Sequence, residues 1–339
     1  NEKSNYLPAP VECNLDPIAE CNLQCQFCIG QRYLRNNRTE AGSSRKLPTN
    51  YIRNLVYFLA RWGVRGLCIS GGGEPTLHEG IWDLPEFAIS RGLEVALVTN
   101  GTVKNDKLFE NMMCCRWVSF SVDSAEASSY AKIKGQDLFA KVVSNISKIS
   151  NLRSKLRSKV DLCFKYLLLP ENSHTIYEAC KLAKSLGVQD FHVRPVDFER
   201  SDIEGHKQLD LNKELILEQF QKCHEEETSD FRVYTVTHKF DSNFHVKHDF
   251  NACLAAPLVI PILSDGNAYI CVDKKMEAQY KIGSCSPYPD VIVDWWGKNA
   301  HRQLVNSINI NNCSRCTWSQ YNRQIAEVVG EDKMCVNFP

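Results

Sequence analysis

The stretch NLDPIAECNLQCQFC, residues 14–28, places three cysteines directly after a short apolar segment. The apolar residues at 15–19 predict a β-strand, and Cys21, Cys25 and Cys28 follow it with the spacing C-x3-C-x2-C. Three soft thiolates on one loop suit three irons of a [4Fe–4S] cubane, and the fourth iron then has no protein ligand. We therefore interpret this loop as a cluster site with an open iron.

A zinc site is the alternative for this loop. Zinc needs a fourth ligand nearby, and no Cys or His follows Cys28 until Cys68. Cys13 precedes the loop, at the far end of the predicted strand. The spacing therefore favours the iron–sulfur cluster.

Strands and helices are predicted to alternate along the chain on both sides of this loop. The predicted strands lie at 15–19, 66–70, 94–99, 117–122, 161–169 and 191–193. The predicted helices lie near 49–62, 82–91, 104–113, 137–152, 173–187 and 212–225. Six such units predict an α/β fold with a parallel sheet and outer helices, either a partial (β/α)6 barrel or a doubly wound sheet. Active sites of such folds lie at the carboxyl ends of the strands, where the cysteine loop is expected.

The alternation stops after residue 250. Asp265-Gly266-Asn267 is a turn signal between two β-rich runs, and a helix near 295–308 and a cysteine-bearing loop are expected after it. We therefore expect a core over 14–225, a linker over 226–250 and a small second domain over 251–339.

Four cysteines of the expected second domain also have metal-ligand spacing. Cys253 and Cys271 form C-x12-G-x4-C around Gly266, and Cys313 and Cys316 follow as C-x2-C. These four thiolates can complete a second [4Fe–4S] cluster, and a four-cysteine zinc site is the alternative. Seven of the nine remaining cysteines mostly lie in predicted apolar elements, where buried thiols are inert: Cys13, Cys68, Cys114, Cys115, Cys163, Cys180 and Cys223.

The first cysteine loop resembles the signature of the radical S-adenosylmethionine (SAM) superfamily, C-x3-C-x-aromatic-C, with Phe27 in the aromatic position. The segment SGGGEP at 70–75 is similar to the family's GGE motif. The resemblance implies that Gly72, Gly73 and Glu74 hold the methionine amino group of SAM, since glycines allow close approach and a carboxylate suits an ammonium. It also implies a partial barrel over roughly 14–225.

Further strand ends match places where the family has polar groups near SAM. Asn100 ends the third predicted strand, and Ser121 and Asp123 end the fourth, with their side chains alternating onto one face. The resemblance implies that these groups lie near the ribose and the methionine of SAM. Lys165 and Arg194 are candidates for binding the SAM carboxylate or the substrate.

The second cysteine group resembles the opening of the SPASM auxiliary-cluster domain, whose full form continues as C-x2-C-x5-C-x3-C. Here Asn322 stands where the next cysteine is expected, and no C-x3-C follows. This departure favours the shorter twitch form, a β-hairpin plus helix around one auxiliary [4Fe–4S] cluster. Cys285 and Cys335 are spare thiols that can replace an assigned ligand.

The resemblance implies an enzyme that reductively cleaves SAM, with electrons from a donor such as flavodoxin or ferredoxin, and removes a hydrogen atom from its substrate. An auxiliary cluster that accepts the remaining electron predicts a two-electron oxidation, such as alcohol dehydrogenation. A thiol that returns a hydrogen predicts epimerisation, and Cys285 is the first choice for that thiol.

The expected substrate is a small polar hydroxylated molecule of the aminocyclitol or sugar type, as in twitch-bearing relatives. The first strand near residue 15 leaves no room for the N-terminal peptide-recognition module of many peptide-modifying relatives, although a separate protein can supply one. Modification of a ribosomally made peptide is therefore the alternative. A non-catalytic iron–sulfur or zinc protein is a third possibility, which leaves the SAM-side motifs without a purpose.

The bulk composition excludes several other classes. Forty basic residues balance forty acidic ones without a long block of one sign, which argues against a nucleic-acid partner. No apolar run reaches the roughly 18 residues of a membrane span, and the N-terminus lacks the layout of a signal peptide. We therefore expect a cytoplasmic protein without a membrane partner, whose clustered cysteines are metal ligands rather than disulfides.

Overall fold

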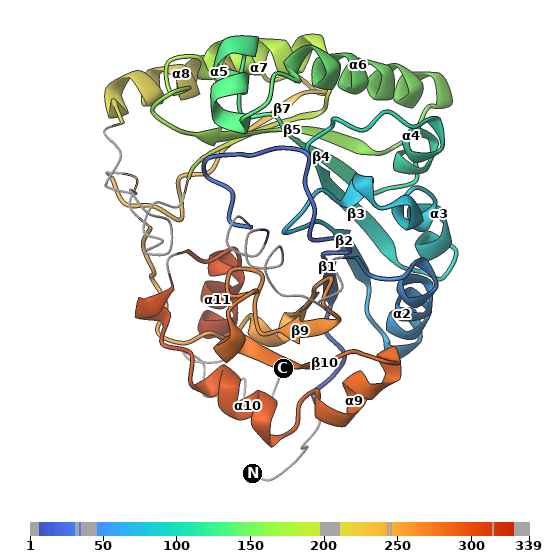
Figure 1. The fold of residues 1–339 in the computed structure, drawn as a ribbon. Helices are drawn as coiled ribbons and strands as arrows, with labels where there is room; N and C mark the ends of the chain where they lie inside the picture. The colour runs from blue at the N-terminus through green and yellow to red at the C-terminus, as the bar shows by residue number, and fades with distance from the viewer. Residues whose placement is uncertain are drawn as a thin grey trace.

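The computed structural model describes residues 7–30, 34, 46–196, 211–242, 244, 246–313 and 315–328. Their strands form one curved sheet in the order β10-β9-β8-β1-β2-β3-β4-β5-β6-β7 (Figure 1). The strands are β1 (Glu12–Leu15), β2 (Gly66–Ile69), β3 (Glu94–Thr99), β4 (Trp117–Ser121), β5 (Asp161–Leu168), β6 (Asp190–Pro195), β7 (Arg232–Thr235), β8 (Val259–Ile262), β9 (Asn267–Tyr269) and β10 (Lys281–Ser284).

The sheet is parallel over most of its width. Strands β1 to β7 lie in chain order, and each pairs in parallel with the next. β8 pairs in parallel with the other side of β1, and β9 and β10 continue the sheet as antiparallel strands. The described strands end in β10 on one side and β7 on the other, so the sheet remains open. The predicted α/β fold of the partial-barrel type is confirmed.

The longer helices lie on one side of this sheet. The helices are α2 (Thr49–Trp62), α3 (Leu84–Ile89), α4 (Asp106–Met112), α5 (Ala127–Lys134), α6 (Phe139–Leu156), α7 (Ile176–Ser185), α8 (Lys213–Glu225), α9 (Ile292–Trp295), α10 (Asn299–Asn306) and α11 (Ser319–Ala326). Figure 1 shows α2, α3, α4, α6, α7 and α8 along the outer, convex side of the sheet. A doubly wound sheet would have such helices on both faces, so that alternative is wrong.

The main core lies between the sheet and these outer helices. Ile69 of β2 and Phe120 of β4 are fully buried there, together with Leu55 and Leu59 of α2. Burial of each such side chain stabilises the fold by about 1.5–3 kcal/mol. Because strand side chains alternate between faces, the intervening strand residues point to the concave inner face, and many of them are polar.

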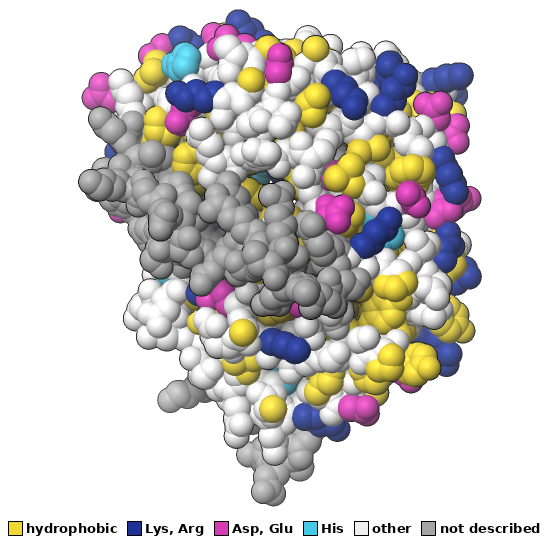
Figure 2. Space-filling model, in the orientation of Figure 1, with side chains coloured by type: hydrophobic (Ala, Val, Ile, Leu, Met, Phe, Trp, Pro, Cys, Tyr) yellow, Lys and Arg dark blue, Asp and Glu magenta, His cyan; other side chains and the backbone are white. Residues whose placement is uncertain are grey.

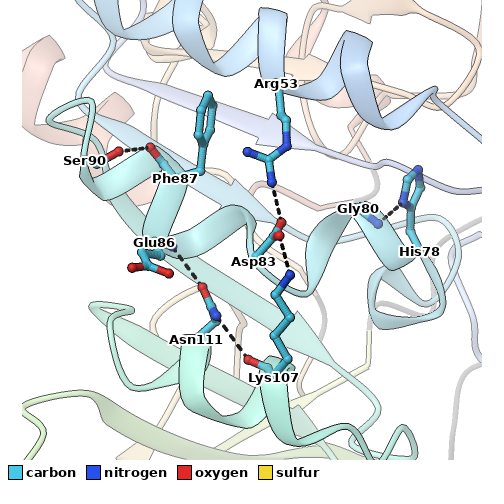
Figure 3. Close-up of polar contacts among 9 residues, drawn as sticks. All are labelled: Arg53, His78, Gly80, Asp83, Glu86, Phe87, Ser90, Lys107 and Asn111. Atoms are coloured by element: carbon cyan, nitrogen blue, oxygen red, sulfur yellow. Dashed lines mark hydrogen bonds and ion pairs between the residues drawn. The ribbon is translucent and has the colours of Figure 1, made fainter.

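Ionic and polar contacts also join the outer helices. The carboxylate of Asp83, just before α3, accepts from Arg53 of α2 at 2.7 Å and from Lys107 of α4 at 2.6 Å (Figure 3). The side-chain oxygen of Asn111 accepts from the backbone N–H of Glu86 at 3.3 Å. These contacts fix the order of α2, α3 and α4 around the sheet.

Several local expectations need correction. The first strand covers Glu12–Leu15 rather than 15–19, since Pro17 has no N–H to continue the ladder. β7 lies within the expected linker over 226–250 and adds a seventh parallel strand next to β6. The short helix α5, between β4 and α6, was not expected. The turn at 265–267 does connect two antiparallel strands, with Gly266 at a φ of 74°.

The described surface has mixed charge. Figure 2 shows basic and acidic side chains interspersed over the upper and right-hand parts of this face. None of the helices described in the structure is both long and apolar enough to cross a membrane.

Candidate active site

The three-cysteine loop lies on the inner side of the sheet, where the last turn of α5 holds it in place. The backbone N–H groups of Gln24 and Gln26 donate to the carbonyls of Lys134 and Ile133, at 2.9 and 3.1 Å. Gly135 ends α5 with a φ of 68°, and a Cβ there would lie 2.9 Å from the Cβ and the carbonyl oxygen of Gln24. Only glycine permits this close approach.

Cys21, Cys25 and Cys28 are all partly exposed in this loop. The N–H of Leu23 donates to the sulfur of Cys21 at 3.4 Å. Burial raises the pKa of the Cys21 thiol to about 12, and neighbouring negative groups, including Cys25 and Cys28, act in the same direction. Three thiolates on one loop therefore need a compensating cation, which the irons of a cluster would provide. The donor set thus fits the predicted [4Fe–4S] cluster.

Single-ion sites have a different geometry. Within the described part of the chain, no three His, Cys, Asp or Glu side chains are grouped so that they could hold one metal ion. A cubane does not require such a group, because each thiolate binds a different iron. Phe27, in the aromatic position of the motif, packs with the small cluster of Ile133, Leu169 and Val196.

The glycine-rich segment after β2 packs directly on the cysteine loop. A Cβ on Gly73 would lie 2.3 Å from the carbonyl oxygen of Glu20, and a Cβ on Gly30 would lie 2.3 Å from that of Gly72. The N–H of Glu74 donates to the Glu20 carbonyl at 2.7 Å. Glycine is needed on both sides of this contact, so the two motifs found in the sequence form one structural unit.

Glu74, which the resemblance assigns to the SAM amino group, also has a structural role. Its buried carboxylate accepts from Thr76 N at 3.0 Å, Thr76 Oγ1 at 2.5 Å, Thr99 Oγ1 at 2.6 Å and Asn100 N at 2.7 Å. Three of these donors converge on Oε1, and Asn100 N alone reaches Oε2. Burial raises the pKa of Glu74, and the four donors oppose that shift. Glu74 therefore ties the end of β2 to the end of β3.

Asn100 connects the same strand end to the cysteine loop. Its Nδ2 donates to Asn22 Oδ1 at 2.9 Å and lies 3.9 Å from the sulfur of Cys21. Its Oδ1 accepts from Thr102 N at 2.9 Å and from Thr102 Oγ1 at 2.7 Å. Asn100 thus lies against the three-cysteine loop.

Asp123 is part of a buried ion pair. Its φ is 59°, one carboxylate oxygen pairs with Lys134 Nζ, and the other accepts from Leu167 N at 2.7 Å. The two paired side chains are each 4% exposed. The positive charge of Lys134 also lowers the pKa of Cys25, opposing the larger effect of burial. Sequence reasoning missed Lys134 because it lies in the unexpected helix α5.

Four polar residues form one row across the inner face. Strand register aligns Ser121 of β4 with Lys165 of β5, Lys165 with His192 of β6, and His192 with Tyr234 of β7. Arg194 lies two residues beyond His192 on the same face, aligned with Leu167. Ser121, Lys165 and Arg194 were expected here, whereas His192 and Tyr234 were not.

A family model described as the radical SAM superfamily matches residues 16–188, which begin just after β1 and include the cysteine loop, the glycine-rich segment and β2 to α7. The chain belongs to the radical SAM superfamily. Membership confirms the predicted family and implies SAM and a [4Fe–4S] cluster as cofactors. The cysteine loop and the segment packed on it are the parts of this radical SAM enzyme that fit those cofactors.

Known proteins resemble different portions of this radical SAM enzyme. It is 26% identical over 180 residues to an AdoMet-dependent heme synthase of Methanosarcina barkeri, covering 52% of this chain and 47% of the synthase. It is 26% identical over 147 residues to the mycofactocin maturase MftC of Mycolicibacterium smegmatis, covering 43% of this chain and 36% of MftC. Each of these two matches spans less than half of the relative's own length.

The fold similarity extends further than these matches. SuiB of Streptococcus suis, bound to S-adenosylmethionine, aligns with a TM-score of 0.67 at 16% identity, over 98% of this chain and 77% of SuiB. The structure of anSMEcpe with bound AdoMet aligns with a TM-score of 0.59 at 16% identity, over 91% and 87% of the two chains. At this identity the likeness concerns the fold, and it includes the C-terminal region.

Two side chains organise the four C-terminal cysteines of this radical SAM enzyme. The N–H of Asp273 donates to the sulfur of Cys271 at 3.4 Å, and its buried carboxylate accepts from Thr317 N at 2.6 Å and pairs with Arg315. Asp273 therefore joins Cys271 to the turn that carries Cys313 and Cys316.

Asn322 makes the corresponding link to Cys253. Its Oδ1 accepts from Leu254 N at 2.7 Å and Ala255 N at 2.8 Å, and its Nδ2 donates to the sulfur of Cys316 at 3.5 Å. Asn322 is fully buried, and it occupies the position where a full SPASM sequence has its next cysteine. The fold thus brings all four assigned thiols into one region.

Cys285, the expected catalytic thiol, lies elsewhere. It is fully buried in the main hydrophobic core, its N–H donates to the Gly266 carbonyl at 2.8 Å, and its carbonyl accepts from Tyr51 Oη of α2 at 2.5 Å. A hydrogen donor must reach the substrate radical, and this position gives no access from the inner face. The structure therefore argues against that role for Cys285. Cys335 lies outside the described residues.

A second buried ion pair joins the C-terminal region to the SAM side. Lys275 Nζ lies 2.7 Å from Asp16 Oδ2, with the side chains 6% and 0% exposed. Asp16 also accepts from Gly72 N at 2.9 Å and from Ser70 Oγ at 3.2 Å. Sequence reasoning missed this pair because its members are 259 residues apart.

Proposed function

We propose that this radical SAM enzyme cleaves SAM at a cluster held by Cys21, Cys25 and Cys28 and removes a hydrogen atom from a small polar hydroxylated substrate. When bound, the [4Fe–4S] cluster supplies the electron that splits SAM into methionine and a 5′-deoxyadenosyl radical. The observation that supports this proposal is the direct packing of the glycine-rich segment on the cysteine loop. Because of that contact, the two segments that we propose to hold the cluster and SAM lie against each other.

The side chains and helices around the cysteine loop are proposed to position the reacting groups and to shield them from water. α5 holds the cysteine loop, Glu74 holds the ends of β2 and β3 together, and Asn100 reaches the sulfur of Cys21. Such preorganisation keeps the reacting atoms in place and excludes water, which is the main contribution of a protein to cofactor chemistry. The inner row from Ser121 to Tyr234 is the surface on which we propose that the substrate lies.

The proposed overall reaction is a two-electron oxidation, such as alcohol dehydrogenation. Cys253, Cys271, Cys313 and Cys316 are proposed to bind a second [4Fe–4S] cluster, and full thiolate ligation leaves it suited to accept an electron from the substrate radical. The buried position of Cys285 argues against its use as the hydrogen donor of an epimerisation. A flavodoxin or ferredoxin is the proposed electron donor.

Peptide modification is the second candidate function. It is favoured by the similarity to the mycofactocin maturase, which is 26% identical over 147 residues. Other relatives, such as the dTDP-4-amino-4,6-dideoxy-D-glucose ammonia-lyase of Streptomyces venezuelae, at 24% identity over 168 residues, instead favour a sugar-type substrate.

The test begins with anaerobically reconstituted protein, reduced by dithionite in the presence of SAM. We expect the wild-type protein to form 5′-deoxyadenosine and the C21A/C25A/C28A variant to form none, because the open iron is lost. Product formation by the triple variant would refute the assignment of the catalytic cluster.

A second experiment separates the two proposed reactions once a substrate is found. Oxidation predicts one 5′-deoxyadenosine per product and no solvent deuterium in the product carbon. Epimerisation predicts one deuterium at the inverted carbon in deuterium oxide, because a thiol proton exchanges with solvent. Deuterium incorporation at an unchanged oxidation level would therefore contradict the oxidation proposal.

A further inference from the structure

The helix that holds the three-cysteine loop, α5, also carries two buried polar side chains. Tyr130 and Lys134 are four residues apart, so they share one face of the helix, and they are 0% and 3% exposed. The end of the helix that carries Lys134 binds the loop through its backbone, because the Lys134 carbonyl accepts from the N–H of Gln24 at 2.9 Å. α5 is therefore held against the residues that carry the thiols.

The hydroxyl of Tyr130 has no hydrogen-bond partner among the described residues. The ring of Tyr130 packs against that of Phe139, with 5.6 Å between centroids, and this packing would serve a phenylalanine equally well. A buried hydroxyl without a partner is unfavourable, so native structures rarely leave one unpaired. The orphaned Oη therefore indicates an acceptor that the described side chains and backbone do not supply.

The charged neighbours of this hydroxyl are two cysteines of the loop and one ion pair. Burial raises the pKa of Tyr130 to about 12, and the charge of Lys134 opposes this rise. Cys25, Asp123 and Cys21 raise the pKa of Tyr130 further through their negative charge. Of these neighbours, Asp123 is already paired with Lys134, which leaves the two sulfurs as acceptors.

We propose that the hydroxyl of Tyr130 donates a hydrogen bond to a sulfur at the three-cysteine loop when the [4Fe–4S] cluster is bound, and that it thereby raises the reduction potential of this cluster. Hydrogen bonds to the sulfurs are among the factors that set such potentials. Reduction adds one negative charge to the cluster, and an O–H group directed at a sulfur stabilises that charge.

This inference rests on the proposed function and assigns Tyr130 a part in electron uptake. The phenol keeps its proton throughout, so the added electron comes from the external donor alone and no bond of Tyr130 is broken. A higher potential makes the cluster easier for that donor to reduce. The role is separate from packing, because it belongs to the hydroxyl and not to the ring.

The experiment compares Y130F with the matched variant Y166F on anaerobically reconstituted protein. Both tyrosines are fully buried, and each change removes only a hydroxyl. The hydroxyl of Tyr166, in contrast, already donates to the carbonyl of Asn172 at 2.7 Å. The midpoint potential is measured by redox titration followed by electron paramagnetic resonance. The signal that changes when SAM is added to a matched sample belongs to the cluster with the open iron, and that signal is followed.

At one solution potential, we expect the ratio of reduced to oxidised cluster to be about threefold or more lower in Y130F than in the wild-type protein, because the reduced form loses a hydrogen bond. A tenfold change in this ratio corresponds to about 59 mV for a one-electron couple. Y166F should keep the wild-type ratio and unfold at a lower urea concentration, because it loses a partnered hydroxyl. In deuterium oxide, electron–nuclear double resonance should detect a deuteron near the reduced cluster in the wild-type protein and Y166F that is missing from Y130F.

Equal midpoint potentials in Y130F and the wild-type protein would overturn the inference, and so would an equal shift in Y166F. A deuteron signal that is unchanged in Y130F would also contradict it. Loss of the cluster from Y130F, measured as an iron content below that of Y166F, would show a structural role instead and would equally overturn it. The proposed function fails separately, if the wild-type protein forms no 5′-deoxyadenosine from SAM, whatever the potential of its cluster.

Discussion

Replacing Lys275 by Met tests whether the C-terminal region is coupled to the SAM side of the enzyme. Lys275 is the ionic partner of Asp16, at 2.7 Å, and Asp16 is fully buried. Removal of one member of a buried pair leaves an uncompensated charge and costs about 3–5 kcal/mol. Asp16 keeps its contacts to Gly72 N and Ser70 Oγ, which stabilise the remaining carboxylate, so we expect a loss near the lower limit, about 3 kcal/mol.

The assay is urea unfolding followed by tryptophan fluorescence, with K281M as the matched control because Lys281 is exposed. The D16N/K275M variant should be less destabilised than the sum of D16N and K275M, since it leaves no buried charge. K275M should also bind SAM several-fold more weakly, because Asp16 holds the N–H of Gly72. The coupling would be refuted if the losses of stability in D16N and K275M simply added up in the double variant. It would also be refuted if K275M lost stability to within about 0.5 kcal/mol of the control, which is about the accuracy of such comparisons.

Three further outcomes are expected from other sites. E74Q should lower both stability and SAM affinity, by about 2–4 kcal/mol for stability, because an amide NH2 would face donors that now bind a carboxylate; unchanged urea unfolding would contradict this. N322A should reduce the iron content from about eight to about four per chain, since the loop after Cys253 loses its acceptor; a retained count of eight would show that Asn322 is dispensable. Burial lowers the pKa of His301 from 6.5 to about 4, so neutral His301 contributes its full share of the folding stability above pH 6.5 and loses it as the pH falls towards 4. Over that range, the free energy of unfolding of the wild-type protein should fall by about 3 kcal/mol relative to that of H301Q. Parallel pH profiles of the two proteins would refute this.

Local patterns in the sequence were sufficient for most of the regular structure. The apolar spacing over 49–62 predicted the bounds of α2, and the β-rich run at 94–99 predicted those of β3. The elements that were missed are short. α5 has eight residues and β7 has four, and such short segments show little periodicity of their own because tertiary contacts stabilise them.

The same difference between local and distant contacts decides which site residues the sequence could predict. The loop with Cys21, Cys25 and Cys28 could be recognised because all three ligands lie within eight consecutive positions. The partners of Glu74 could not be recognised in the sequence, because its carboxylate binds Thr99 and Asn100, which lie at the end of the next strand. The burial of Cys285 likewise depends on packing with distant parts of the chain.

By itself, the sequence determined the family, the order of the βα units and the positions of both cysteine groups, since each depends on residue types at short spacing. Only the tertiary structure decided which charges are compensated. Lys134 pairs with Asp123 and Lys275 pairs with Asp16, whereas no described carboxylate pairs with Lys165. The physical reason is that a buried charge interacts with whatever the fold brings within a few ångströms, and strand register and helix packing set those distances rather than the local sequence.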